Sequence, residues 1–147
     1  MNTDKISRRV WLPLSAALIF AIPVVVSYST IAAAVDIKLT LAGDQEVPPV
    51  KTTGTGAGTI IVGTDKSVSG SVKTSGITGT AAHIHEAAAG QNGPVIIPLT
   101  QAGDTYSVPA GAKLTDAQFA SFQAGKLYVN VHTAANPGGE IRAQLKP

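Results

Sequence analysis

Apolar and polar residues alternate through most of the chain from Val35 onward, and glycine or proline interrupts this pattern repeatedly. In DIKLTLAG, for example, Ile37, Leu39 and Leu41 fall on one face of an extended strand. Eight segments carry the pattern: residues 36–43, 56–63, 66–76, 80–87, 93–99, 104–111, 126–133 and 139–145. Short alternating segments separated by turn residues predict an all-β domain. We expect an antiparallel β-sandwich of about eight strands with Greek-key-like connections.

One segment, KLTDAQFASFQAGK, departs from the alternation and carries helix signals instead. Thr115 followed by Gln118 forms a capping-box pattern, and Gly125 is a typical residue at a helix end. Phe119 and Phe122 fall close to one side of such a helix, which makes them candidates for the core. The sequence therefore predicts one short helix that covers an end of the sandwich.

The stretch from Gly43 to Gly58 has the composition of a loop. Pro48 and Pro49 precede a glycine-rich run, so we expect an exposed extended edge or loop. Its glycines do not have the GxGxxG spacing of a dinucleotide site, and no GK[ST] follows them. The chain also lacks the GxSxG motif of a hydrolase nucleophile.

The first 34 residues have a different character from the rest. Lys5, Arg8 and Arg9 precede an apolar run over residues 10–31, and the alanines of residues 32–34 follow it. A basic start, an apolar run and small residues predict a secretory signal peptide cleaved near the third alanine. The run is also long enough to span a bilayer, which takes about 20 residues, so a retained membrane anchor is the alternative.

The paired arginines in SRRVWL resemble a twin-arginine export signal, and the same residues also fit an ordinary secretory signal. Both routes place the mature domain, residues 35–147, outside the cytoplasm, in the periplasm or the medium. Contact with a membrane is expected only where residues 1–34 are retained.

Charge and cysteine content exclude several kinds of function. The mature segment has eight basic and eight acidic residues, so the net charge of +2 belongs to the signal segment. A nucleic-acid binder needs a basic face, and we therefore expect no nucleic-acid partner. The absence of cysteine excludes disulfides, thiol nucleophiles and thiolate metal sites.

The three histidines form the candidate site. His83 and His85 flank Ile84, so on a strand they share one face while Ile84 takes the other. In KLYVNVHT, Leu127, Val129 and Val131 occupy one face, which leaves Tyr128, Asn130 and His132 on the other. If the two strands are neighbours in matching register, all three imidazoles lie on one polar surface.

A histidine pair on one strand with a third histidine from another strand is a donor set for zinc or copper. We therefore predict His83, His85 and His132 as ligands of a divalent metal ion. The alternative is that they are surface histidines with ordinary hydrogen bonds, because sequence alone does not fix the register of the strands.

The segments LAGDQEVPPV, GTGAGT, HIHEAAAGQNGPVIIPL and LYVNVHTAANPGGEIRAQL, in this order, resemble the chordin-type (CHRD) domain. The resemblance covers about residues 36–146 and implies an extracytoplasmic all-β domain, similar to bacterial single-domain secreted members. In animals, similar domains occur within chordin, a secreted antagonist of growth factors. That role is not transferred here, because the chain lacks chordin's cysteine-rich modules. The resemblance supplies no catalytic residues.

These observations leave three functions open. The first is an exported binding domain that holds copper or zinc. The second is a structural or adhesive domain without metal, whose polar face meets a protein or polysaccharide partner. The third is a metalloenzyme similar to copper-zinc superoxide dismutase, although that enzyme uses more histidines and an aspartate. We favour a function without catalysis.

The last loop, TAANPGGE, has the residues of a tight turn that joins two strands into a hairpin. Glu140 and Arg142, on either side of Ile141, are expected to form a surface pair with each other or with a neighbour across the strands.

Overall fold

The computed structural model describes residues 33–147. Apart from its last two alanines, the predicted signal segment of residues 1–34 lies outside this part of the chain. The elements are β1 (Ala34–Ala42), the 3₁₀ turn η1 (Gly43–Gln45), β2 (Thr55–Gly63), β3 (Val68–Ser75), β4 (Gly79–Glu86), β5 (Val95–Pro98), β6 (Thr100–Ala102), β7 (Thr105–Ser107), α1 (Asp116–Gln123), β8 (Leu127–Thr133) and β9 (Ile141–Leu145).

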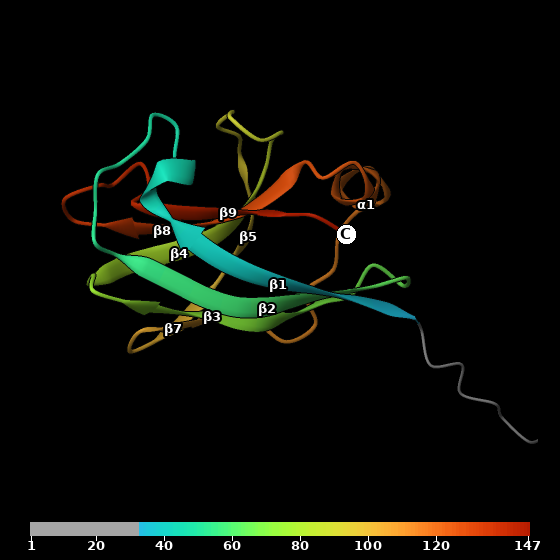
Figure 1. Ribbon diagram of the computed structural model, residues 1–147. Coiled ribbons are helices and arrows are strands. Elements are labelled where there is room, and N and C mark those ends of the chain that lie inside the picture. Colours follow the sequence, from blue (N-terminus) through green and yellow to red (C-terminus); the bar gives the residue numbers. More distant parts are fainter. Residues whose placement is uncertain (1–32) are drawn as a thin grey trace, which may run out of the picture. The chain divides into compact units, whose positions relative to one another are not determined.

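The nine strands form one antiparallel sheet in the order β5-β4-β8-β9-β1-β2-β3-β7-β6. It folds over on itself, so that β1, β2 and β3 form one layer and β4, β8 and β9 form the other (Figure 1). The two layers join at β1 and β9, which share the pair Ala42 and Arg142. The predicted all-β sandwich is thus confirmed, and its continuous, folded sheet is nearly barrel-like.

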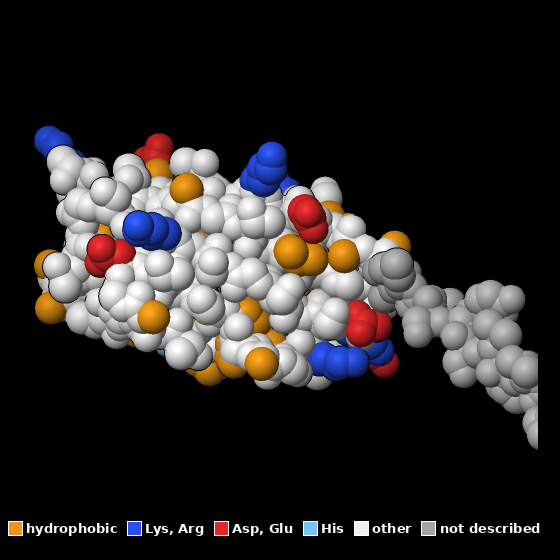
Figure 2. All heavy atoms as spheres, turned by 90° about the horizontal axis from the view of Figure 1, so that it is seen from below, with side chains coloured by type: hydrophobic (Ala, Val, Ile, Leu, Met, Phe, Trp, Pro, Cys, Tyr) orange, Lys and Arg blue, Asp and Glu red, His pale blue; other side chains and the backbone are white. Residues whose placement is uncertain are grey.

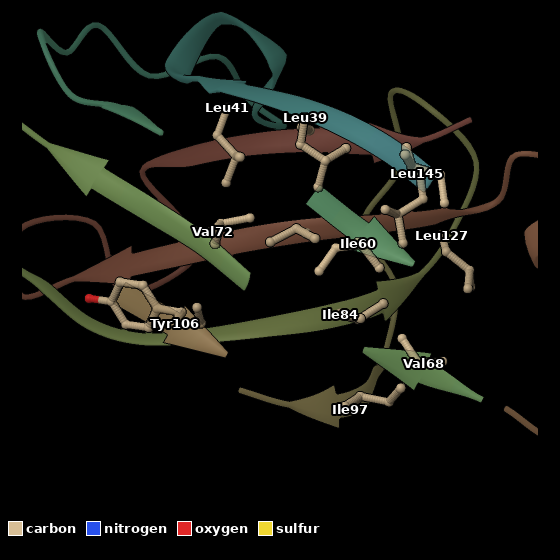
Figure 3. Close-up of a cluster of buried hydrophobic side chains, with 14 of the residues drawn as sticks. Leu39, Leu41, Ile60, Val68, Val72, Ile84, Ile97, Tyr106, Leu127 and Leu145 are labelled. Carbon is tan, nitrogen blue, oxygen red and sulfur yellow. The ribbon is translucent and has the colours of Figure 1, made fainter. Parts of the chain in front are cut away.

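The apolar faces of the strands meet between the two layers (Figure 3). Leu41, Ile60, Val72 and Ile84 are each 0% exposed. Such burial stabilises the fold by about 1.5–3 kcal/mol for each large aliphatic side chain. All eight predicted segments contain a strand, and β6 is the additional one. Its residues are all exposed, so no buried positions mark it in the sequence.

The predicted helix is present, and both of its ends are capped as the sequence indicates. The Thr115 hydroxyl accepts a hydrogen bond from the Gln118 N–H at 3.2 Å, and the Gln118 side chain accepts one from the Thr115 N–H at 2.9 Å. Phe122 is 2% exposed and packs in the core, while Phe119 packs against it. No helix within residues 33–147 is long and apolar enough to cross a membrane.

The stretch from Gly43 to Gly58 only partly agrees with its prediction as an exposed loop. Pro48 and Pro49 are exposed, but Glu46 is buried, and the last residues of the stretch belong to β2. The composition of the stretch does not predict that Glu46 is buried, because the burial of its side chain depends on a partner residue far along the chain.

Charged side chains are sparse on the face of the domain shown in Figure 2. On the face shown in Figure 2, lysine and arginine side chains are scattered singly among polar and backbone atoms and next to acidic ones. This agrees with the equal numbers of basic and acidic residues in residues 35–147.

Candidate metal centre

The pairing of β4 with β8 brings the three histidines onto one face of the sheet. In the antiparallel register Ile84 lies opposite Val129, and His132 lies opposite Ala81. Ile84 and Val129 are 0% exposed and face the core. Because side chains alternate along a strand, His83, His85 and His132 point to the other side.

The imidazole rings lie close enough to share one ion. One nitrogen from each histidine lies within 4.8 Å of the other two, and no carboxylate among the described residues joins this group. The ring centroids are 5.5 Å apart for His83 and His85, 4.8 Å for His83 and His132, and 5.8 Å for His85 and His132. The structure therefore brings together all three of the residues singled out in the sequence.

Backbone carbonyls orient two of the rings. The Nδ1 atom of His85 lies 3.0 Å from the Gly93 oxygen, and the Nδ1 atom of His132 lies 2.9 Å from the Pro137 oxygen. A carbonyl oxygen only accepts, so each Nδ1 carries the proton and donates it. In each neutral ring the lone pair is therefore on Nε2, the atom available to bind a metal ion.

The Nε2 atom of His85 is buried and has no hydrogen-bond partner. An unsatisfied buried acceptor costs about 1–3 kcal/mol, so such an atom calls for an explanation. The Nε2 atom of His132 lies 2.9 Å from the Nδ1 atom of His83. Because His132 has its proton on Nδ1, the Nδ1–H of His83 donates to His132 in the metal-free protein.

The sheet face that carries the three histidines is less exposed to solvent than the sequence indicates. His85 is only 7% exposed, because the segment between β4 and β5 covers it. Burial lowers the pKa of His85, and the nearby charges of His132 and Arg142 add to this, against the hydrogen bond to Gly93. Burial likewise lowers the pKa of His83, together with the charges of the other two histidines. Both rings thus favour the neutral form that binds metal.

A buried ion pair that the sequence patterns do not predict lies beside the histidines. The Nη2 atom of Arg142 lies 2.9 Å from Oε2 of Glu46, and both side chains are 3% exposed. The guanidinium carbon lies 4.0 Å from the centroid of the Tyr128 ring, which in turn stacks on His85 at 4.9 Å and 7°. The expected surface pair of Glu140 or Arg142, with each other or with a neighbour across the strands, is therefore wrong, because both side chains are buried and Arg142 pairs with Glu46 from the loop after β1.

Glu140 has a different set of partners. Its carboxylate accepts hydrogen bonds from Thr133 at 2.5 Å, Thr52 at 2.6 Å and Asn136 at 3.1 Å. These hydrogen bonds, that from Thr133 above all, lower the pKa of Glu140. They fix the predicted hairpin turn between β8 and β9, and with it the Pro137 carbonyl that orients His132.

Comparison with known families identifies the family of this chain's domain. The family model described as CHRD domain matches residues 37–145. No curated protein and no solved structure matches the chain. The matched stretch contains all three histidines and the loops that cover them.

Proposed function

The chain belongs to the CHRD domain family, and from that premise we propose that it is an exported domain holding one copper or zinc ion through His83, His85 and His132. The observation that carries the proposal is the buried Nε2 atom of His85, which has no partner. The Gly93 carbonyl occupies Nδ1 of this ring, which leaves Nε2 as its nitrogen for a cluster in which one nitrogen of each imidazole lies within 4.8 Å of the other two. An ion in that cluster would satisfy the atom.

The donor set supports copper or zinc over other common metals. Neutral imidazole nitrogens suit both ions, at about 2.0–2.1 Å for zinc, whereas calcium and magnesium prefer oxygen ligands. Three protein ligands leave a further coordination position for water or a small ligand. The domain's proposed role is to bind the ion, and no reaction is assigned to it.

A structural or adhesive domain without metal is the second candidate, and one observation favours it. The hydrogen bond between His83 Nδ1 and His132 Nε2 satisfies both atoms without an ion. It does not satisfy the Nε2 atom of His85, which the metal proposal explains. In this second candidate the polar face meets a protein or polysaccharide.

Export is supported by the amino-terminal pattern of residues 1–34. Mass spectrometry of the protein recovered from the expressing cells and their medium tests it. Loss of about 34 residues supports cleavage, and a full-length mass in the membrane fraction shows that the segment is retained as an anchor.

Calorimetric titration of the exported protein with copper(II) and with zinc(II) tests the metal site. We expect one ion per chain for the wild type and the loss of most affinity in His85→Ala. Ser69→Ala is the matched control, since Ser69 is an exposed polar residue of β3, away from the strands that carry the histidines. Equal affinity of His85→Ala and the wild type would contradict the proposal.

A further inference from the structure

Arg142 of β9 reaches across to the segment that connects β4 with β5. Its Nη1 atom donates to the Gln91 carbonyl at 2.9 Å, and its Nη2 atom donates to Oδ1 of Asn92 at 2.5 Å. The side-chain amide of Asn92 also donates to the Val47 carbonyl at 2.8 Å. One buried side chain therefore fixes two consecutive residues of an otherwise exposed segment.

The next residue of that segment, Gly93, makes the contacts that matter for the histidines. Its carbonyl accepts from Nδ1 of His85 at 3.0 Å, and its N–H donates to the Tyr128 hydroxyl at 3.1 Å. A Cβ atom at this position would lie 1.9 Å from the Glu86 carbonyl oxygen, so the backbone packs directly on β4. Only glycine permits this approach.

The guanidinium is itself held rigidly. Its Nε atom donates to Oε2 of Glu46 at 3.1 Å, and its face lies over the Tyr128 ring. A planar fork with several donors meets all of these partners at once, whereas an ammonium group is a single point of charge. Lysine at this position keeps the charge beside Glu46 but cannot reproduce the fork.

We propose that Arg142 is the positioning residue for His85. By holding Gln91 and Asn92 it keeps the Gly93 carbonyl on Nδ1 of His85, and this leaves Nε2 as the free donor atom. The inference rests on the proposed metal site. Partners that orient a metal-binding histidine through its second nitrogen typically change metal affinity about 10–100-fold when they are removed.

Two variants of the full chain test the role of Arg142. Arg142→Lys removes the fork but keeps a positive charge beside Glu46. Lysine is chosen because loss of one partner of a buried ion pair is strongly destabilising. Asn92→Ala, at an exposed residue, removes one contact of the fork together with the hydrogen bond to the Val47 carbonyl, and leaves the ion pair with Glu46 intact. Asp116→Asn, which removes one partner of the exposed ion pair with Lys66, is the control.

Histidine-ring nitrogen NMR of the metal-free protein gives a readout that does not depend on metal. In both variants we expect His85 to lose its fixed Nδ1–H tautomer, while His132 keeps its own because Pro137 is held independently. Persistence of the fixed His85 tautomer in a folded Arg142→Lys variant would overturn the proposal. If Arg142→Lys fails to fold, Asn92→Ala decides in the same way.

Zinc titration gives the second readout, with weaker binding by about 10–100-fold in both variants and no change in Asp116→Asn. Folded variants that bind zinc within about two-fold of the wild type would contradict the inference, since the expected loss is much larger. Absence of zinc binding by the wild type would instead refute the proposed function, and the NMR comparison would still decide whether Arg142 positions His85.

Discussion

The Nδ1 atom of His83 lies 2.9 Å from the Nε2 atom of His132, although 49 residues separate them in sequence. The contact follows from the pairing of β4 with β8, whose apolar residues face the core and leave the histidines on the opposite side. His85 joins them from the same strand as His83. The arrangement therefore depends on the register of one strand pair.

Zinc affinity should resist mild acidification. Protons compete with metal for the imidazole nitrogens, and the pKa values of His83 and His85 lie below the ordinary value of 6.5. Competition at these two rings therefore begins only below about pH 6.5. We expect titrations at several pH values to give nearly constant affinity above this point and weaker binding below it. A steep loss of affinity between about pH 8 and pH 7 would contradict this prediction.

The stability of the metal-free protein should fall over the same acidic range. In the unfolded chain His83 and His85 take up protons near pH 6.5, whereas in the folded chain their pKa values are lower. As the pH falls below 6.5 the unfolded state binds more protons, so the free energy of unfolding decreases until the folded-state pKa values are passed. Urea unfolding of the wild type and of His85→Ala should show a smaller decrease in the variant. An equal decrease in the free energy of unfolding of the two proteins would mean that protonation of His85 does not contribute to the loss of stability.

Substitution of Glu140 should destabilise the hairpin that orients His132. Glu140→Gln replaces one carboxylate oxygen with an NH2 group, which cannot accept a hydrogen bond, either from Thr52 at Oε1 or from Thr133 and Asn136 at Oε2. We expect a loss of about 1–3 kcal/mol in the free energy of unfolding, measured with urea. Asp36→Asn, at an exposed carboxylate of β1, is the control. It should change the free energy of unfolding by less than about 0.5 kcal/mol. Equal effects of the two substitutions would show that the network does not stabilise the fold.

The two glycines of the same hairpin should differ sharply in their tolerance of alanine. A Cβ atom at Gly139 would lie 2.4 Å from Nδ2 of Asn130, and the residue has a φ of +132°. Gly138 has no atom within 4 Å of such a Cβ. Thermal unfolding should therefore show a loss of about 1–3 kcal/mol in Gly139→Ala and little change in Gly138→Ala. The reverse order would contradict the described turn.

Much of the fold could be predicted from the sequence because its determinants are local. Alternation assigns Ile84 and Val129 to the core and their neighbours to the opposite face, whatever the rest of the chain does. The helix likewise has both its capping box and its end signal within one short segment. The same alternation placed the three histidines on one side of their strands.

The surroundings of the histidines could not be predicted, because they depend on loops that meet only in the folded chain. Glu46 lies 96 residues from Arg142, in a stretch whose prolines and glycines suggest an exposed loop. Burial of His85 depends on Gly93, whose backbone covers it after a turn that sequence patterns do not place. The pattern thus identified the candidate ligands but not what holds them.

The metal content of the protein, purified without a histidine tag and without added metal, tests the central claim most directly. Elemental analysis of the wild type should give about one copper or zinc ion per chain, as one three-histidine site requires. His132→Ala, purified in parallel, should contain almost none. A wild-type protein without bound metal that also takes up neither copper nor zinc on titration, or equal metal content in the two proteins, would contradict the assignment of His83, His85 and His132 as a metal site.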